Sequence, residues 1–164
     1  MKVITSAVAG LLSAVTLAVS PVSARVDSYT TTLLRSLQNS GISLSLNPTK
    51  CDGTYHGMYS TNRVMTLCYK GTPNANDHDT VLHETIHAVQ HCAAEKRGLS
   101  NTLVPILQGD ELNRFIRANL DDRTILKITS HYPKHQHPVE LEAFAAANAY
   151  TAKQIESIFK SWCT

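Results

Sequence analysis

The spacing of apolar positions predicts one domain that is mostly helical, beginning with a helix and a short strand. Leucines recur at helical spacing over residues 33–37, so we expect a helix from Asp27 or Ser28 to near Gly41. Apolar residues then alternate with serines over residues 42–46, which is the period of a strand.

A β-hairpin is predicted next. Residues 53–59 and 63–69 are rich in β-branched and aromatic residues, and the turn-prone residues 60–62 separate them. Folding this hairpin brings Cys51 near Cys68, so we expect a disulfide between them.

The rest of the chain has the periodicity of helices. We expect them over residues 79–97, 110–120, 121–130 and from just past Pro138 to Trp162, the last with a break near Thr151. Residues 131–138 carry two prolines in eight positions, so we expect no regular structure there. Together these elements predict a single α+β domain over residues 25–164, with most of its mass in helices.

The first 24 residues have the pattern of a secretory signal peptide. Lys2 precedes the apolar residues 3–19, and the small residues 22–24 offer a cleavage site after Ala24. A membrane anchor is the alternative, but the apolar stretch is short and interrupted, and no basic cluster follows it. We therefore expect a secreted or periplasmic protein without stable membrane insertion after cleavage.

Composition narrows the possible partners. The 164 residues are 43% apolar and 17% charged, with a net charge of +2, so the chain lacks the concentrated basic charge of a nucleic-acid-binding protein.

Four cysteines in an exported chain predict two disulfides, for which three pairings exist. A four-thiolate metal site is disfavoured because no CxxC spacing occurs. Nothing in the sequence indicates the oligomeric state.

The motif His-Glu-Thr-Ile-His at residues 83–87 carries the candidate chemistry. On a helix, His83 and His87 lie one turn apart on the same face and can bind one zinc ion together. Zinc lowers the pKa of water towards neutrality, and Glu84 is placed to take up the proton and pass it to a leaving amine. The surrounding residues are uncharged, which suits a buried helix. His91 lies one turn further on, too far along a straight helix to share the ion.

Residues 80–89 resemble the extended HExxH pattern of the zincin metallopeptidases, and in particular of those whose third ligand is a glutamate on a later helix (gluzincins). In these families a small residue follows that glutamate by three positions. Both Glu140 and Glu142 satisfy this pattern, but they point about 200° apart on a helix, so only one can reach the ion. We favour Glu140 because apolar residues extend its face, and keep Glu142 as the alternative.

The resemblance implies further features of the site. An edge strand, which we place at residues 63–69, would align an extended peptide over the motif helix. A tyrosine or histidine before the ligand helix would donate a hydrogen bond to the developing oxyanion, which makes Tyr132 and His131 the candidates. With Glu140 at the metal, a later segment would return to the far end of the motif helix, which favours a Cys92–Cys163 disulfide.

These observations predict an exported zinc metallopeptidase with one zinc ion, acting on a peptide or protein substrate. A first rival is an exported, disulfide-stabilised zinc-binding domain with little or no hydrolytic activity. Glu84 argues against it, because a purely structural site gains nothing from a base there. A second rival is a helical interaction module in which the HExxH spacing is accidental.

Overall fold

The computed structural model describes residues 22–49, 51–53, 55–69 and 75–164. This part of the chain is α+β and mostly helical, with six α-helices and one three-stranded sheet. The predicted signal peptide lies outside the described residues except for its last three positions, which form the start of the first helix.

The three strands are β1 (Ser43–Leu46), β2 (Gly57–Ser60) and β3 (Val64–Leu67), and their order in the sheet is β1-β3-β2. β2 and β3 form the predicted hairpin, with Tyr59 opposite Met65. β1 pairs with β3 in parallel. The expectation that residues 63–69 form an edge strand is therefore wrong, because β3 has neighbours on both sides and the hairpin strand at the edge is β2.

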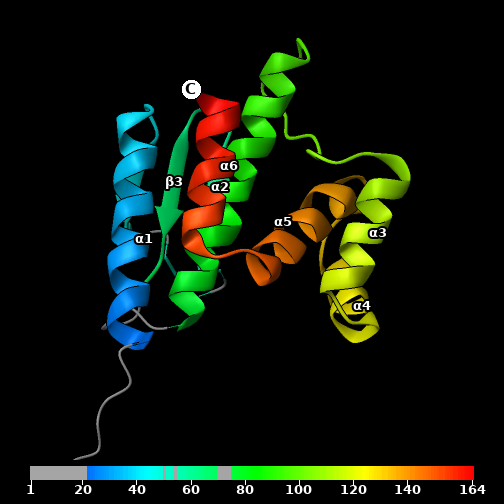
Figure 1. Ribbon diagram of the computed structural model, residues 1–164, viewed down its shortest axis with the longest axis horizontal. Helices are drawn as coiled ribbons and strands as arrows, with labels where there is room; N and C mark the ends of the chain where they lie inside the picture. The colour runs from blue at the N-terminus through cyan, green and yellow to red at the C-terminus, as the bar shows by residue number, and fades with distance from the viewer. Residues whose placement is uncertain (1–21, 50, 54, 70–74) are drawn as a thin grey trace, which may run out of the picture.

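The core is built around α2 (Ala75–Lys96), which packs against α1 (Val22–Asn39), α6 (Ala152–Cys163), β2 and β3. α1, α2 and α6 lie side by side in Figure 1. The largest buried side chains of this core include Leu33, Leu37, Ile86, Ile155 and Phe159. Other elements cover α2 on several sides, so its buried residues are not confined to one stripe. The uncharged residues around the motif had predicted such a buried helix.

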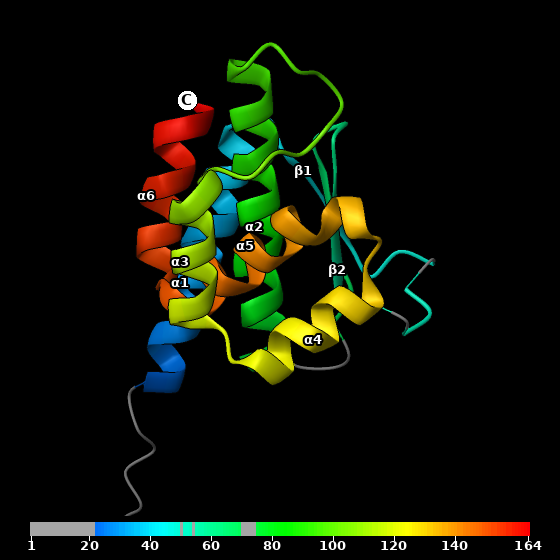
Figure 2. The ribbon, with the colours of Figure 1, turned by 90° about the vertical axis from the view of Figure 1, so that its right-hand side faces the viewer.

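α5 (His137–Ala149) crosses α2 and is the helix against which the remaining elements pack. α3 (Gly109–Asn119) and α4 (Asp122–His131) both pack against α5 rather than against α1 or α6. Figure 2 shows α5 crossing α2, with α4 and β2 on neighbouring sides of the crossing. A 3₁₀-helix, η1 (Lys134–Gln136), joins α4 to α5.

Several predicted boundaries need correction. α1 begins at Val22 rather than at Asp27 or Ser28, because no glycine or proline intervenes to stop the helix. α2 begins at Ala75, four residues before the expected Asp79. Residues 131–138 are not irregular throughout: they contain η1 and the start of α5, where Pro138 is tolerated in the first turn of the helix.

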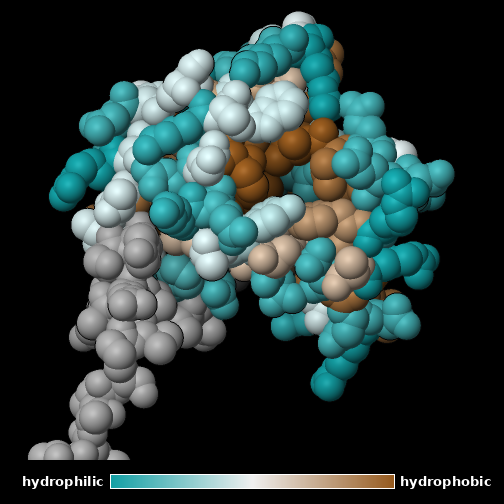
Figure 3. All heavy atoms as spheres, viewed as in Figure 1, coloured by the Kyte–Doolittle hydropathy of each residue, from teal (hydrophilic) through white to brown (hydrophobic). Residues whose placement is uncertain are grey.

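Both predicted disulfides are present. Cys51–Cys68 joins the segment after β1 to the end of β3, and Cys92–Cys163 joins the last turns of α2 and α6. Within the described residues, no helix combines the length and the hydrophobicity needed to cross a membrane. The face seen in Figure 1 is largely hydrophilic, with apolar side chains gathered in a hollow near its centre (Figure 3).

Candidate metal centre

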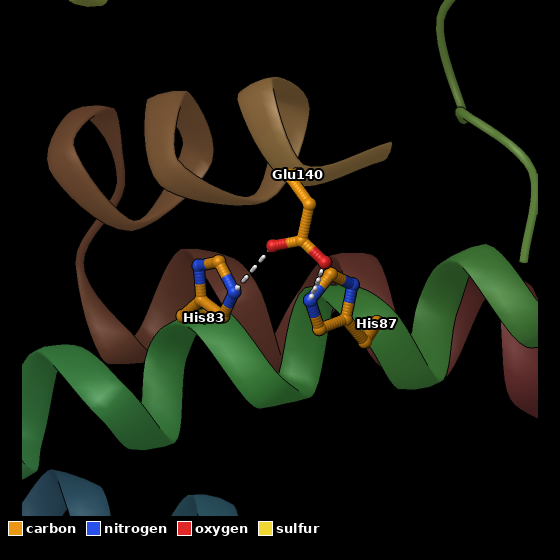
Figure 4. Close-up of side chains that lie close together, drawn as sticks. All are labelled: His83, His87 and Glu140. Carbon is orange, nitrogen blue, oxygen red and sulfur yellow. Dashed lines mark ion pairs between the residues drawn. The ribbon is translucent and has the colours of Figure 1, made fainter. Parts of the chain in front are cut away.

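The two histidines of the motif lie one turn apart on α2, on a buried face of the helix. His83 is 8% exposed and His87 5%. Their ring centroids are 4.5 Å apart and the rings are nearly perpendicular, at 88°. Both Nε2 atoms are directed towards α5, as Figure 4 shows.

Glu140, in the first turn of α5, completes the group. Its Oε2 lies 3.4 Å from His83 Nε2, and its Oε1 lies 3.5 Å from His87 Nε2 (Figure 4). One ligand atom from each of the three residues lies within 4.8 Å of the other two. Two imidazoles from one helix and a carboxylate from another therefore form a group that could hold a metal ion.

The electrostatics of the group reflect this crowding. Burial raises the pKa of the Glu140 carboxyl, but the imidazoles of His83 and His87 beside its two oxygens outweigh burial and lower that pKa to about 2. Burial lowers the pKa of His87, but Glu140 and the charge of Glu84 outweigh it and raise that pKa above 6.5. A negative carboxylate thus lies beside the imidazole of His87, whose cationic form it favours, at a place where a metal cation would supply the positive charge.

Unsatisfied polar atoms converge on the same place. Within the described part of the chain, three buried side-chain atoms have no hydrogen-bond partner: His83 Nδ1, Glu84 Oε2 and Glu140 Oε2. Buried polar atoms are rarely left unpaired, because each unpaired atom costs free energy of desolvation. The free oxygen of Glu140 is a metal-ligand type already next to an imidazole nitrogen, so the donor set fits a metal ion.

Glu84 is one of the residues that line a cleft of about 910 Å³. The start of β2, the first turns of α2, the α3–α4 junction, α4 and the second half of α5 form its walls. His83 and Glu84 both line the cleft, so a molecule in it would lie against Glu84 and against one of the three candidate metal ligands. Glu84 is 5% exposed and is not part of the group of three.

Tyr132, between α4 and η1, lines the cleft close to Glu140. Burial, and then the charges of Glu140 and Glu84, raise the pKa of its phenol to about 12, so the hydroxyl keeps its proton at neutral pH. Its ring lies 6.4 Å from that of Phe144, which also contacts His83. His131 lines the cleft as well, but its side chain is exposed.

The structure separates the two candidate glutamates. Glu142 does not join the histidines: its buried carboxylate accepts hydrogen bonds from Gln90 Nε2 and from the backbone N–H groups of Ile106 and Leu107. His91 is likewise outside the group, with its Nδ1 3.0 Å from the Tyr59 hydroxyl.

One residue of the site was not anticipated from the sequence. A Cβ atom on Gly57 would lie 2.5 Å from Thr80 Cγ2 and 3.0 Å from Glu84 Cγ, so the backbone of β2 touches the motif helix beside Glu84. A glycine inside a strand can mark such a close approach, and that signal was available in the sequence.

No family model matches the chain, and neither a curated protein nor a solved structure is detectably similar to it.

Proposed function

We propose that this protein is an exported zinc-dependent metallopeptidase. The observation that carries the proposal is the convergence of His83, His87 and Glu140, with Glu84 beside them in the lining of a cleft. Two histidines and a glutamate are the ligand set of catalytic zinc sites that keep a fourth position open, whereas structural zinc sites use four protein ligands. The two disulfides agree with an oxidising compartment.

Bound zinc would supply Lewis acidity, which polarises a peptide carbonyl and makes water a better nucleophile at neutral pH. His83, His87 and Glu140 would hold the ion. Glu84 would accept the proton of the attacking water through its unpaired Oε2 and return it to the leaving amine. The protonated hydroxyl of Tyr132 would donate a hydrogen bond to the carbonyl oxygen as negative charge develops on it.

The substrate in this proposal is a peptide in extended conformation. The start of β2 lines the cleft and β2 is at the edge of the described sheet, so its outer edge could pair with an extended chain. The cleft continues between α4 and α5, where Ile128, Phe144 and Ala147 offer apolar surface to a substrate side chain.

The direct test is Glu84→Gln, which keeps the shape of the side chain and removes its basicity. We expect hydrolysis of labelled casein to fall by a factor of about 100 or more, because general acid–base catalysis contributes on that order. Zinc content, measured by atomic spectroscopy on the purified protein, should stay at one ion per chain because Glu84 is not a ligand.

Glu111→Gln, an exposed glutamate on α3, is the matched control and should retain wild-type activity. Stoichiometric zinc without hydrolysis by the wild type would favour the rival zinc-binding domain. A wild type without zinc would contradict the proposal.

A further inference from the structure

Gln90 is completely buried on α2, one turn beyond His87, and contacts Nδ1 of that imidazole, whereas Nε2 is the nitrogen near Glu140. Its Oε1 lies 2.7 Å from His87 Nδ1. Its Nε2 lies 2.9 Å from the backbone carbonyl oxygen of Val139 and 2.9 Å from Glu142 Oε2. All the hydrogen-bonding atoms of this amide are therefore engaged.

Glu142 extends the chain of hydrogen bonds to the segment between α2 and α3. Its Oε2 accepts the backbone N–H of Ile106 at 2.8 Å, and its Oε1 accepts that of Leu107 at 2.7 Å. Arg97 holds the same segment from the other side by donating to the carbonyl oxygens of Pro105 and Ile106. Ile106 and Leu107, which do not line the cleft, are thus connected to the candidate metal group through the side chains of Glu142 and Gln90.

The direction of each hydrogen bond follows from the chemistry of the partners. The Val139 carbonyl can only accept, and the Glu142 carboxylate already accepts two backbone N–H groups. The amide nitrogen of Gln90 must face these two acceptors, which turns its oxygen towards His87. His87 Nδ1 must then carry a proton, so that in the neutral ring, the form that binds a metal, the lone pair is on Nε2, the nitrogen beside Glu140.

We propose that Gln90 and Glu142 are positioning residues that fix the tautomer and ring orientation of His87 for metal binding. The inference rests on the proposed zinc site and adds that zinc affinity depends on the hydrogen bonds between Glu142 and the backbone of Ile106 and Leu107. His83 has no equivalent support, because its Nδ1 has no hydrogen-bond partner among the described residues. Loss of such a supporting partner typically weakens metal binding about 10–100-fold.

The test compares zinc dissociation constants, measured by competition with a chromophoric chelator, for the wild type, Gln90→Leu and Glu142→Gln. We expect Gln90→Leu to weaken zinc binding about 10–100-fold. Glu142→Gln should weaken it less, because an amide oxygen still accepts one backbone N–H. Thr85→Val is the matched control: it removes a buried hydroxyl that donates to Val81 O within the same helix, and it should leave zinc affinity unchanged.

A second measurement does not depend on affinity or activity. In ¹⁵N NMR spectra of the zinc-loaded protein, the His87 ring proton should reside on Nδ1, and this signal should be lost or shifted in Gln90→Leu. A proton on Nε2, wild-type zinc affinity in both variants, or an equal loss of affinity in Thr85→Val would each overturn the inference. If Gln90→Leu does not fold, Glu142→Gln decides alone, and wild-type affinity in it overturns the inference.

The outcomes also separate this inference from the proposed function. Tight zinc binding without peptide hydrolysis would contradict the peptidase and leave the role of Gln90 intact. A zinc-dependent peptidase whose affinity is insensitive to Gln90 and Glu142 would contradict only the present inference. A wild type that binds no zinc would contradict both.

Discussion

The buried carboxylate of Glu140 and the imidazole of His87 couple protonation to stability. The pKa of His87 is raised in the metal-free folded protein above the ordinary histidine value of 6.5. Between these two pKa values the folded protein therefore keeps a proton on His87 that the unfolded chain releases. The corresponding stabilisation is complete below that value and is lost as the pH rises through the raised pKa. Glu140 behaves in the opposite sense, because its pKa falls from 4.5 to about 2: its stabilisation is present above 4.5 and is lost as the pH falls towards 2.

We therefore expect the metal-free protein to lose stability on the alkaline side while its apparent zinc affinity rises. Zinc must displace the proton on His87, so binding strengthens with pH until that group is neutral. Urea unfolding with a chelator present should show that wild type and His87→Gln converge in stability as the pH rises. His135→Gln, at an exposed position on η1, should follow the wild type at every pH. A gap that widens with pH would contradict this account.

Tyr132 offers a second test at the scale of one atom. Tyr132→Phe keeps the ring that lies near Phe144 and removes only the hydroxyl. We expect kcat to fall by a factor of about 100–1,000, with little change in KM or zinc affinity, because the hydroxyl would act only as charge develops on the substrate oxygen. Tyr150→Phe, whose ring stacks on Phe115 away from the cleft, should retain kcat. A 100–1,000-fold rise in KM with unchanged kcat would contradict this and would indicate that the hydroxyl binds the substrate instead.

The sequence predicted the two histidines more surely than the glutamate, and the reason is physical. Helical periodicity alone places His83 and His87 on one face, whatever the rest of the fold. Glu140 and Glu142 share the same local pattern, and what separates them is tertiary: the amides of Ile106 and Leu107 engage the carboxylate of Glu142. That contact joins residues 35 or more positions apart, so no local pattern could reveal it.

At the scale of elements, the approach of β2 to α2 sets the position of Glu84. Gly57 belongs to β2, and the absence of a Cβ lets the strand backbone lie against Thr80 and Glu84. β2 is also the edge strand that the proposed substrate would pair with. One strand therefore contacts the candidate base and borders the cleft in which the peptide would lie.

Gly57→Ala should separate these two elements. The added methyl would lie 2.5 Å from Thr80 Cγ2, which requires a shift that costs about 1–3 kcal/mol of stability. The added methyl would also lie next to Glu84, so we expect the rate of hydrolysis to fall by more than the loss of folded protein explains. Adding Thr80→Ser removes Cγ2 and keeps the hydroxyl, so the double variant should regain part of both. An active, fully stable Gly57→Ala variant would show that the approach is not required.

The order of the strands could not be obtained from the sequence, although the strands themselves could. Alternation at residues 42–46 and the turn at residues 60–62 predict three strands and one hairpin. Which strand of the hairpin accepts β1 depends on the path of the chain after α1, and no periodicity encodes it. The parallel pairing of Leu44 with Met65 puts β3 in the centre and leaves β2 at the edge beside the cleft.

At the scale of the whole molecule, the two disulfides constrain different parts of the fold. Cys92–Cys163 spans 71 residues and connects the end of the motif helix to the end of α6. Cys51–Cys68 spans only 17 residues, but it lines a small cavity of about 230 Å³ that shares Tyr55 and His56 with the cleft. We therefore expect Cys92–Cys163 to restrain the global fold and Cys51–Cys68 to shape the approach to the cleft.

We compare two variants, each with both cysteines of one bridge replaced by alanine. The variant that loses more stability should be the one whose substrate binding changes less. Chain entropy assigns about 4 kcal/mol to a loop of 71 residues and about 3 kcal/mol to one of 17, so urea unfolding should show the larger loss without Cys92–Cys163. The variant without Cys51–Cys68 should instead show the larger rise in KM, because Tyr55 and His56 line the same small cavity as the bridge and also line the cleft. If one variant ranked first in both measurements, the division between a fold-restraining and a cleft-shaping bridge would be wrong.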